Sequence, residues 1–184
     1  MKNLSLIIIV IFVTAYNSIG QNRFNLGAGY FGNTLTYPGL VLEAEWETNY
    51  TGKVSLPLRI DLGFYVHKRY NIGVFTDVNY GFRQYFKSGI YLEESIGVGV
   101  LTTFLSNDAT YEVNSAGGIS ETSNFGSVDF MPSVTLGVGY NLTRRSDKTN
   151  LIWLRPKIFW QYPHKTTSTY NPGIQVGYTY TLSR

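Results

Sequence analysis

Few residues of this chain have the types and spacing that chemistry requires. The chain has no cysteine, which excludes thiol nucleophiles, disulfides and thiolate zinc clusters. Its two histidines, His67 and His164, each precede a lysine at the expected end of a strand. That position is more typical of a solvated loop residue than of a metal ligand. Only His164 with Ser168 suggests a base beside a nucleophile. We therefore expect no catalytic residue, no metal ion and no cofactor.

The remaining chemical motifs match by letters alone. Residues 27–32 read Gly-Ala-Gly-Tyr-Phe-Gly, which resembles a dinucleotide fingerprint, but no helix follows as that motif requires. The acidic and amide residues Asn107, Asp108, Glu112 and Glu121 have the oxygen ligands that calcium prefers. Their spacing fits no loop that supplies ordered calcium ligands.

Ten charged residues form a more informative pattern, because they alternate with apolar residues in short segments. Successive side chains of a strand point to opposite faces, so the charges share one face with rows of glycine. Acids and bases alternate between segments and can neutralise one another in a narrow interior. The ten residues of this expected charge network are Glu43, Glu45, Glu47, Arg59, Asp61, Asp77, Arg83, Glu93, Arg155 and Lys157.

The opposite face is bulky and apolar, as in Leu26-Gly27-Ala28-Gly29-Tyr30. A soluble barrel would place that bulk inside, where a narrow lumen has little room for it. Rows of glycine have no use on a water-facing surface, since glycine weakens a strand and marks close packing. The pattern therefore predicts that the apolar face meets lipid.

These faces belong to eight segments with a period of two residues. The segments span residues 24–31, 40–47, 58–66, 71–85, 90–101, 128–142, 151–162 and 173–182. No other apolar run approaches the length that a membrane-spanning helix needs. We predict an all-β protein, an eight-stranded antiparallel up-and-down transmembrane β-barrel.

Two residues conflict with the alternation. Glu94 lies on the apolar face between Leu92 and Ile96, where a bulge or a position near the periplasmic rim would account for it. Pro156 interrupts the seventh strand and cannot donate a ladder hydrogen bond.

The first twenty residues have the character of a secretory signal. Lys2 precedes an apolar run from Leu4 to Val13, and small residues occupy Ser18 and Gly20, the positions that a signal peptidase reads. We expect a signal peptide over residues 1–20 and one barrel domain over residues 21–184. Removing Lys2 leaves 15 − 1 = 14 basic against 12 acidic residues. This balance argues against a nucleic-acid partner.

The longest connection runs from Thr102 to Ser127 and is rich in Ser, Asn, Gly and acidic residues. Short turns on one side and long loops on the other are expected of outer-membrane barrels, which predicts that this loop is extracellular. Such a composition buries little apolar area. Any contact with a partner would use its few anchors, Tyr111, Val113, Ile119 and Phe125.

Four motifs together resemble the small outer-membrane β-barrel proteins of Gram-negative bacteria, most closely their poorly characterised members. They are Leu26 to Tyr30, Tyr37 to Leu40, Tyr91 to Gly99 and Leu154 to Phe159. The resemblance covers nearly all of residues 21–184 and implies secretion to the periplasm and insertion into the outer membrane. It carries no catalytic motif.

The leading functional hypothesis is a non-enzymatic, monomeric barrel with a charge-plugged lumen. Its role would be structural or would depend on its extracellular loops. The partners expected for it are outer-membrane lipid, lipopolysaccharide and an unidentified surface protein. Two alternatives stay open at this point. One is an outer-membrane enzyme that modifies lipid A, and the other is a narrow carrier for a small hydrophobic ligand.

Overall fold

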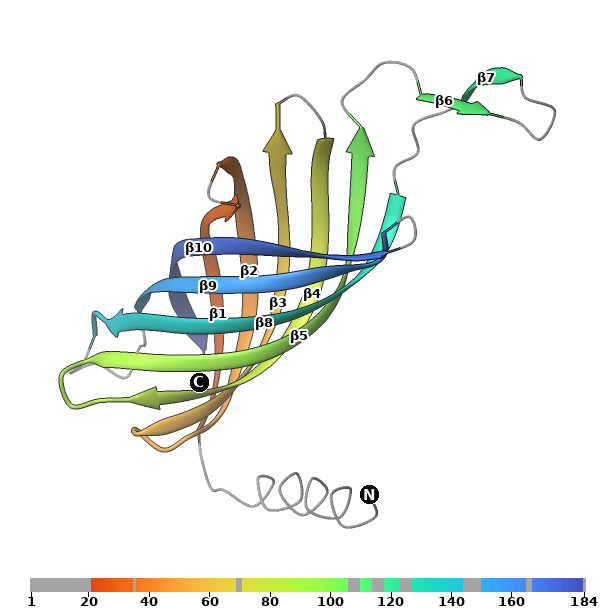
Figure 1. Cartoon of the computed structure of the whole chain (residues 1–184). Helices are drawn as coiled ribbons and strands as arrows, with labels where there is room; N and C mark the ends of the chain where they lie inside the picture. Colours follow the sequence, from red (N-terminus) through yellow and green to blue (C-terminus); the bar gives the residue numbers. More distant parts are fainter. Residues whose placement is uncertain are drawn as a thin grey trace, which may run out of the picture.

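The computed structural model describes residues 21–34, 36–68, 71–105, 110–113, 118–122, 127–143, 150–164 and 167–183. Eight long strands close into a barrel in the order β1-β10-β9-β8-β5-β4-β3-β2, and every neighbouring pair is antiparallel (Figure 1). These strands are β1 (Gln21–Asn33), β2 (Tyr37–Tyr50), β3 (Val54–His67), β4 (Asn71–Tyr85), β5 (Ile90–Leu105), β8 (Ser127–Asn141), β9 (Leu151–His164) and β10 (Thr167–Ser183). The predicted eight-stranded antiparallel barrel is confirmed.

The long connection between β5 and β8 contains regular structure that the sequence did not indicate. Strands β6 (Thr110–Val113) and β7 (Ile119–Thr122) form a separate two-stranded sheet, which lies apart from the barrel wall (Figure 1). The expected loop from Thr102 to Ser127 is therefore wrong at its edges, because β5 continues to Leu105 and β8 begins at Ser127. Backbone hydrogen bonds can continue a strand whatever its side chains are. A strand end whose side chains do not alternate between apolar and polar therefore cannot be recognised from the sequence pattern.

The two ends of the barrel differ in their connections. At one end, here called the turn end, β2 joins β3, β4 joins β5 and β8 joins β9. At the other, the loop end, β5 reaches β8 through the β6–β7 hairpin. Two of the turns use glycine at positive φ, with Gly52 at 83° and Gly89 at 90°, a conformation that other residues adopt only with strain. Among the described residues, no helix has the length and apolar character needed to cross a membrane.

Alternate residues of the barrel strands point to opposite faces, as the period of two predicts. In β3, Leu62 is 54% exposed on the outside, whereas its neighbour Asp61 is 1% exposed inside. The outer face is a continuous band of apolar side chains, which includes Leu42, Ile96 and Leu136. In water, so large an exposed apolar surface would drive aggregation, so this band is the surface that lipid covers.

The structure resolves the two exceptions differently. The pairing of β5 with both neighbours runs without interruption through Glu94, so the bulge expected there is absent and the side chain faces outward. Pro156 lies in β9 and pairs with Ile174 of β10. On the β8 side, pairing stops after Thr135 with Lys157 and resumes at Val138. The missing amide of proline explains this local gap.

We expect Leu62→Arg to destabilise the barrel in lipid by roughly 2–4 kcal/mol, because Leu62 lies near the middle of β3 on the outer face and arginine finds no water there. Equilibrium unfolding of the barrel from lipid vesicles measures the change. Leu62→Ala is the matched control and should cost less, since it adds no charge. Equal stability of Leu62→Arg and the unmodified protein would contradict the assignment of this face to lipid.

Candidate functional site: the charged lumen

The interior of the barrel is organised around the carboxylate of Glu93 in β5. Arginines from three other strands reach it. Nη1 of Arg59 lies 2.6 Å from Oε1 of Glu93, Nη2 of Arg83 lies 2.6 Å from Oε2, and Nε of Arg155 lies 3.3 Å from Oε1. These side chains are 0–1% exposed. A buried carboxylate with three guanidinium partners is fully neutralised and crosslinks β5 to β3, β4 and β9.

Arg83 extends the network toward the turn end. Its guanidinium donates to Glu45, at 2.6 Å from Nη2, and to Glu47, at 3.2 Å from Nη1. Glu47 also accepts a hydrogen bond from Ser55 Oγ at 2.6 Å and one from the hydroxyl of Tyr85. Charge-assisted bonds of this kind are among the stronger ones in proteins, so β2, β3 and β4 are tied together through their side chains as well as their ladders.

Arg155 connects the opposite wall to β2. Its Nη1 lies 2.5 Å from Oε2 of Glu43. The other carboxylate oxygen of Glu43 accepts a hydrogen bond from the hydroxyl of Thr179 in β10. The guanidinium carbon of Arg155 also lies 4.3 Å from the centre of the Trp153 ring, a favourable cation–π distance.

Two acids, Asp61 and Asp77, lie directly opposite each other on β3 and β4. Like charges in that position repel. Lys157 counters the repulsion, with Nζ 2.5 Å from Asp77 and 3.9 Å from Asp61. The amide of Asn79 donates to both carboxylates, at 3.2 Å and 2.9 Å. Arg59 also donates from Nε to Asp61 at 2.9 Å, so an ammonium, a guanidinium and an amide together hold the two acids.

The structure places all ten residues of the sequence-derived set inside the barrel, with exposures of 0–4%. Sequence reasoning missed the neutral side chains that complete their hydrogen bonds. These are Asn25, Ser55, Asn79, Tyr85 and Thr179. Their position in the alternation was a usable signal, since each shares the phase of the buried polar residues on its own strand.

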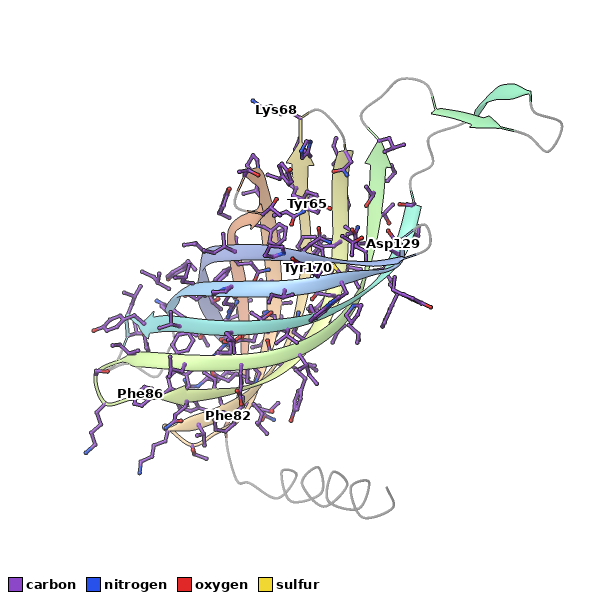
Figure 2. The ribbon with its side chains drawn as sticks, in the orientation of Figure 1. Tyr65, Lys68, Phe82, Phe86, Asp129 and Tyr170 are labelled. Carbon is purple, nitrogen blue, oxygen red and sulfur yellow. The ribbon has the colours of Figure 1, made fainter. Side chains whose placement is uncertain are left out.

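Apolar layers lie on both sides of the network, which the sequence reading did not anticipate. Toward the loop end the Phe31 ring packs against Phe75 at 4.9 Å and Tyr65 at 6.0 Å between ring centres. Toward the turn end Tyr85 packs against Tyr91 at 5.6 Å. Figure 2 shows the side chains filling the barrel, with Tyr65 near the loop end. The full buried apolar set is Phe31, Val41, Tyr65, Phe75, Tyr85, Tyr91, Leu101, Met131, Leu151, Trp153 and Phe159.

Glycine makes room for these rings. The ring of Phe75 lies where a side chain on Gly63 would stand, and the ring of Trp153 does the same at Gly177. Between Phe31, Phe75 and Phe159 the remaining space cannot hold a water-sized sphere. At this level the side chains pack closely across the lumen.

The other candidate residues have different surroundings. His67 is the last residue of β3 and packs against Tyr37 at 3.9 Å between ring centres, so it is no solvated loop residue. The side chains of His164 and Ser168 lie outside the described residues, as does Phe125. Tyr111, Val113 and Ile119 lie on β6 and β7, and their side chains also lie outside the described part. Within the described residues, no three histidine, aspartate or glutamate side chains are arranged to hold a metal ion.

Comparison with known proteins identifies the fold. No protein-family model matches the chain, and no curated protein matches it. Among solved structures, the outer-membrane enzyme PagL is 11% identical, with 84% of this chain and 97% of that chain covered and a TM-score of 0.51. Neisserial surface protein A is 9% identical, with 89% and 96% covered and a TM-score of 0.45. The N-terminal barrel domain of Pseudomonas aeruginosa OprF is 15% identical, with 86% and 99% covered and a TM-score of 0.42.

At these identities the likeness extends to the fold and not to an activity. The chain has the eight-stranded barrel fold of Gram-negative outer-membrane proteins, and its exposed apolar band faces membrane lipid.

We expect Glu93→Gln to lower the free energy of unfolding by about 3–5 kcal/mol, because it leaves three buried guanidinium groups short of one negative charge. The free energy of unfolding is measured by urea unfolding in micelles of a detergent that has no primary amine. Glu94→Gln is the matched control. It makes the same chemical change one residue along, on a side chain that faces outward, and should alter stability little. Equal losses in the two variants would show that the network does not hold the barrel together.

Proposed function

We propose that this protein is a non-enzymatic outer-membrane barrel whose role is structural or depends on its extracellular loops. The observation that carries the proposal is the packed interior. There Glu93 forms ion pairs with Arg59, Arg83 and Arg155, and all four residues are 0–4% exposed. An eight-stranded barrel encloses space for side chains or one small ligand, and here side chains take that space. A solute carrier needs the volume that these residues fill, so the work of the molecule falls to its outer surfaces.

The proposed orientation follows from the connections. Residues 1–20 act as the signal peptide, and the domain over residues 21–184 inserts from the periplasm as a monomer. The turn end then faces the periplasm, and the loop end faces outward, where lipopolysaccharide and surface proteins are the available partners. Short periplasmic turns and longer external loops support this orientation.

A closed lumen has an electrical signature. We expect the purified protein to show no sustained, well-defined conductance in planar bilayers, because the ion network and both aromatic layers obstruct the barrel axis. The matched comparison is Glu93→Gln, in which a weakened network should give more frequent transient openings. Stable unitary currents through the unmodified protein would contradict the plugged lumen.

The β6–β7 hairpin is the proposed contact element. It forms its own sheet and pairs with no barrel strand, so the barrel ladder closes without it. Its register opposes Tyr111 to Glu121 and Val113 to Ile119. A hairpin that stands off the wall is exposed to partners outside the membrane, which is where loops of a rigid scaffold carry function.

Replacing residues 107–123 with a short Gly/Ser turn should leave the folded, heat-modifiable band on gels unchanged, because no ladder bond of the barrel is lost. It should remove binding of the protein to lipopolysaccharide or to bacterial and host surfaces. A scrambled sequence of the same composition is the control. Loss of the folded band would mean that the hairpin packs into the barrel.

A change in lipid A acylation caused by the protein would overturn the non-enzymatic role.

A further inference from the structure

Glu94 and Gln84 are polar side chains on the lipid-facing surface near the turn end. Both point outward, on β5 and β4. Along β5, Glu94 lies between Leu92, 50% exposed, and Ile96, 69% exposed. Across the strands it is opposite Phe82 of β4 and Leu136 of β8. The carboxylate is therefore surrounded on all four sides by apolar side chains that face lipid.

Within the part of the chain that the structure describes, neither polar side chain has a partner. No ion pair and no hydrogen bond to a described residue engages the side chain of Glu94 or of Gln84. A carboxylate on the lipid face costs free energy unless a cation accompanies it. The acids near Glu93 inside the barrel have such a cation, whereas no described residue supplies one to Glu94.

A groove of about 380 Å³ lies at this position. It is lined by Phe82 and Gln84 from β4, by Leu92, Glu93 and Glu94 from β5, and by Leu136 and Gly137 from β8, and of the two glutamates only Glu94 faces outward. Figure 2 shows Phe82 and Phe86 near the same end of the barrel. The groove combines apolar walls with one carboxylate that accepts hydrogen bonds and one amide that both donates and accepts them.

We propose that this groove binds the headgroup of a phospholipid that carries a primary amine, with the carboxylate of Glu94 and the amide oxygen of Gln84 accepting from the lipid ammonium. Gln84 is paired with Leu92, so it stands diagonally from Glu94, at roughly 7–8 Å between Cα atoms. An ammonium between the two side chains can donate to both of them. The proposal rests on the membrane setting of the fold and not on the role of the loops.

The depth of Glu94 suits a headgroup. Glu94 is the fifth residue of β5 counted from the turn end. At about 3.4 Å per residue and a tilt near 40°, it lies roughly 10 Å from that end along the barrel axis. The headgroup layer of one leaflet is on the order of 6 Å thick. The carboxylate is thus close to the boundary between headgroups and hydrocarbon, where a lipid amine can reach it and bulk water is scarce.

Charge complementarity favours the lipid over a second copy of the chain. A second copy would have to bring a cation to this face. Among the described residues, every arginine points into the barrel, and so does Lys157. The lysines that remain, Lys53, Lys68 and Lys87, lie at strand connections and not on the lipid-facing wall. No described cation thus lies on the lipid-facing wall, and this favours the bilayer as the source of the amine.

Native mass spectrometry of the full barrel, released from nanodiscs that contain equal amounts of phosphatidylethanolamine and phosphatidylcholine, tests the proposal. We expect the unmodified protein to retain the ethanolamine lipid about fivefold over the choline lipid, the ratio for an exposed ion pair. Glu94→Gln should abolish the preference and Glu94→Asp should keep it. If the unmodified protein retains both lipids equally, that result alone overturns the proposal.

A second variant tests the site by internal competition. Leu136 is directly opposite Glu94, so Leu136→Lys places an ammonium of the protein beside the carboxylate. This variant should lose the preference for the ethanolamine lipid, whereas Leu136→Met should keep it. Heat-modifiable migration on gels verifies that each variant folds. Preference that persists in both Glu94→Gln and Leu136→Lys would overturn the site, and a dimer that depends on Glu94 would assign the groove to a second copy instead.

Discussion

The contact between Glu93 and three arginines is the interaction on which the rest of the interior depends. Strands of a barrel are joined to their neighbours by backbone hydrogen bonds, but nothing in the ladder joins opposite walls. Arg59 and Arg155 approach Glu93 from strands that are not adjacent to β5. Each bond therefore reaches past the neighbouring strand and joins parts of the wall that the ladder does not join directly. Removing water from these ions is costly, and only mutual pairing of the kind seen here offsets that cost.

The aromatic layers follow from the same constraint. An ion network in a barrel open to water at both ends would be screened and weakened. Rings of Phe31 and Phe75 on one side and of Tyr85 and Tyr91 on the other keep it dry. Because a narrow barrel has little spare volume, several of the large rings lie against a residue without a side chain on a facing strand. Gly63 beside Phe75 and Gly177 beside Trp153 are two such residues, so the glycine pattern and the ring pattern are two parts of one packing solution.

Much of the fold could be predicted from the sequence because it depends on local regularities. Alternation gave the eight strands and the phase of residues such as Asp61 and Leu62, since each side chain can only face in or out. The contacts of Glu93 with three arginines were not predictable in the same way. Which arginine reaches Glu93 depends on the stagger of strands around the barrel, a global property that no single strand encodes. The β6–β7 hairpin was missed because its four-residue strands are too short for alternation to stand out.

Glu93 and Glu94 show how far position alone determines the chemistry of a side chain. The two residues are adjacent, carry the same carboxylate and belong to the same uninterrupted strand. Glu93 forms ion pairs with three guanidinium groups of its own chain, so its charge is balanced within the fold. Glu94 faces outward among Leu92, Ile96 and Phe82, and no described residue pairs with it. A charge on a lipid-facing wall is costly without a cation beside it, and a headgroup amine is the cation that we propose balances Glu94.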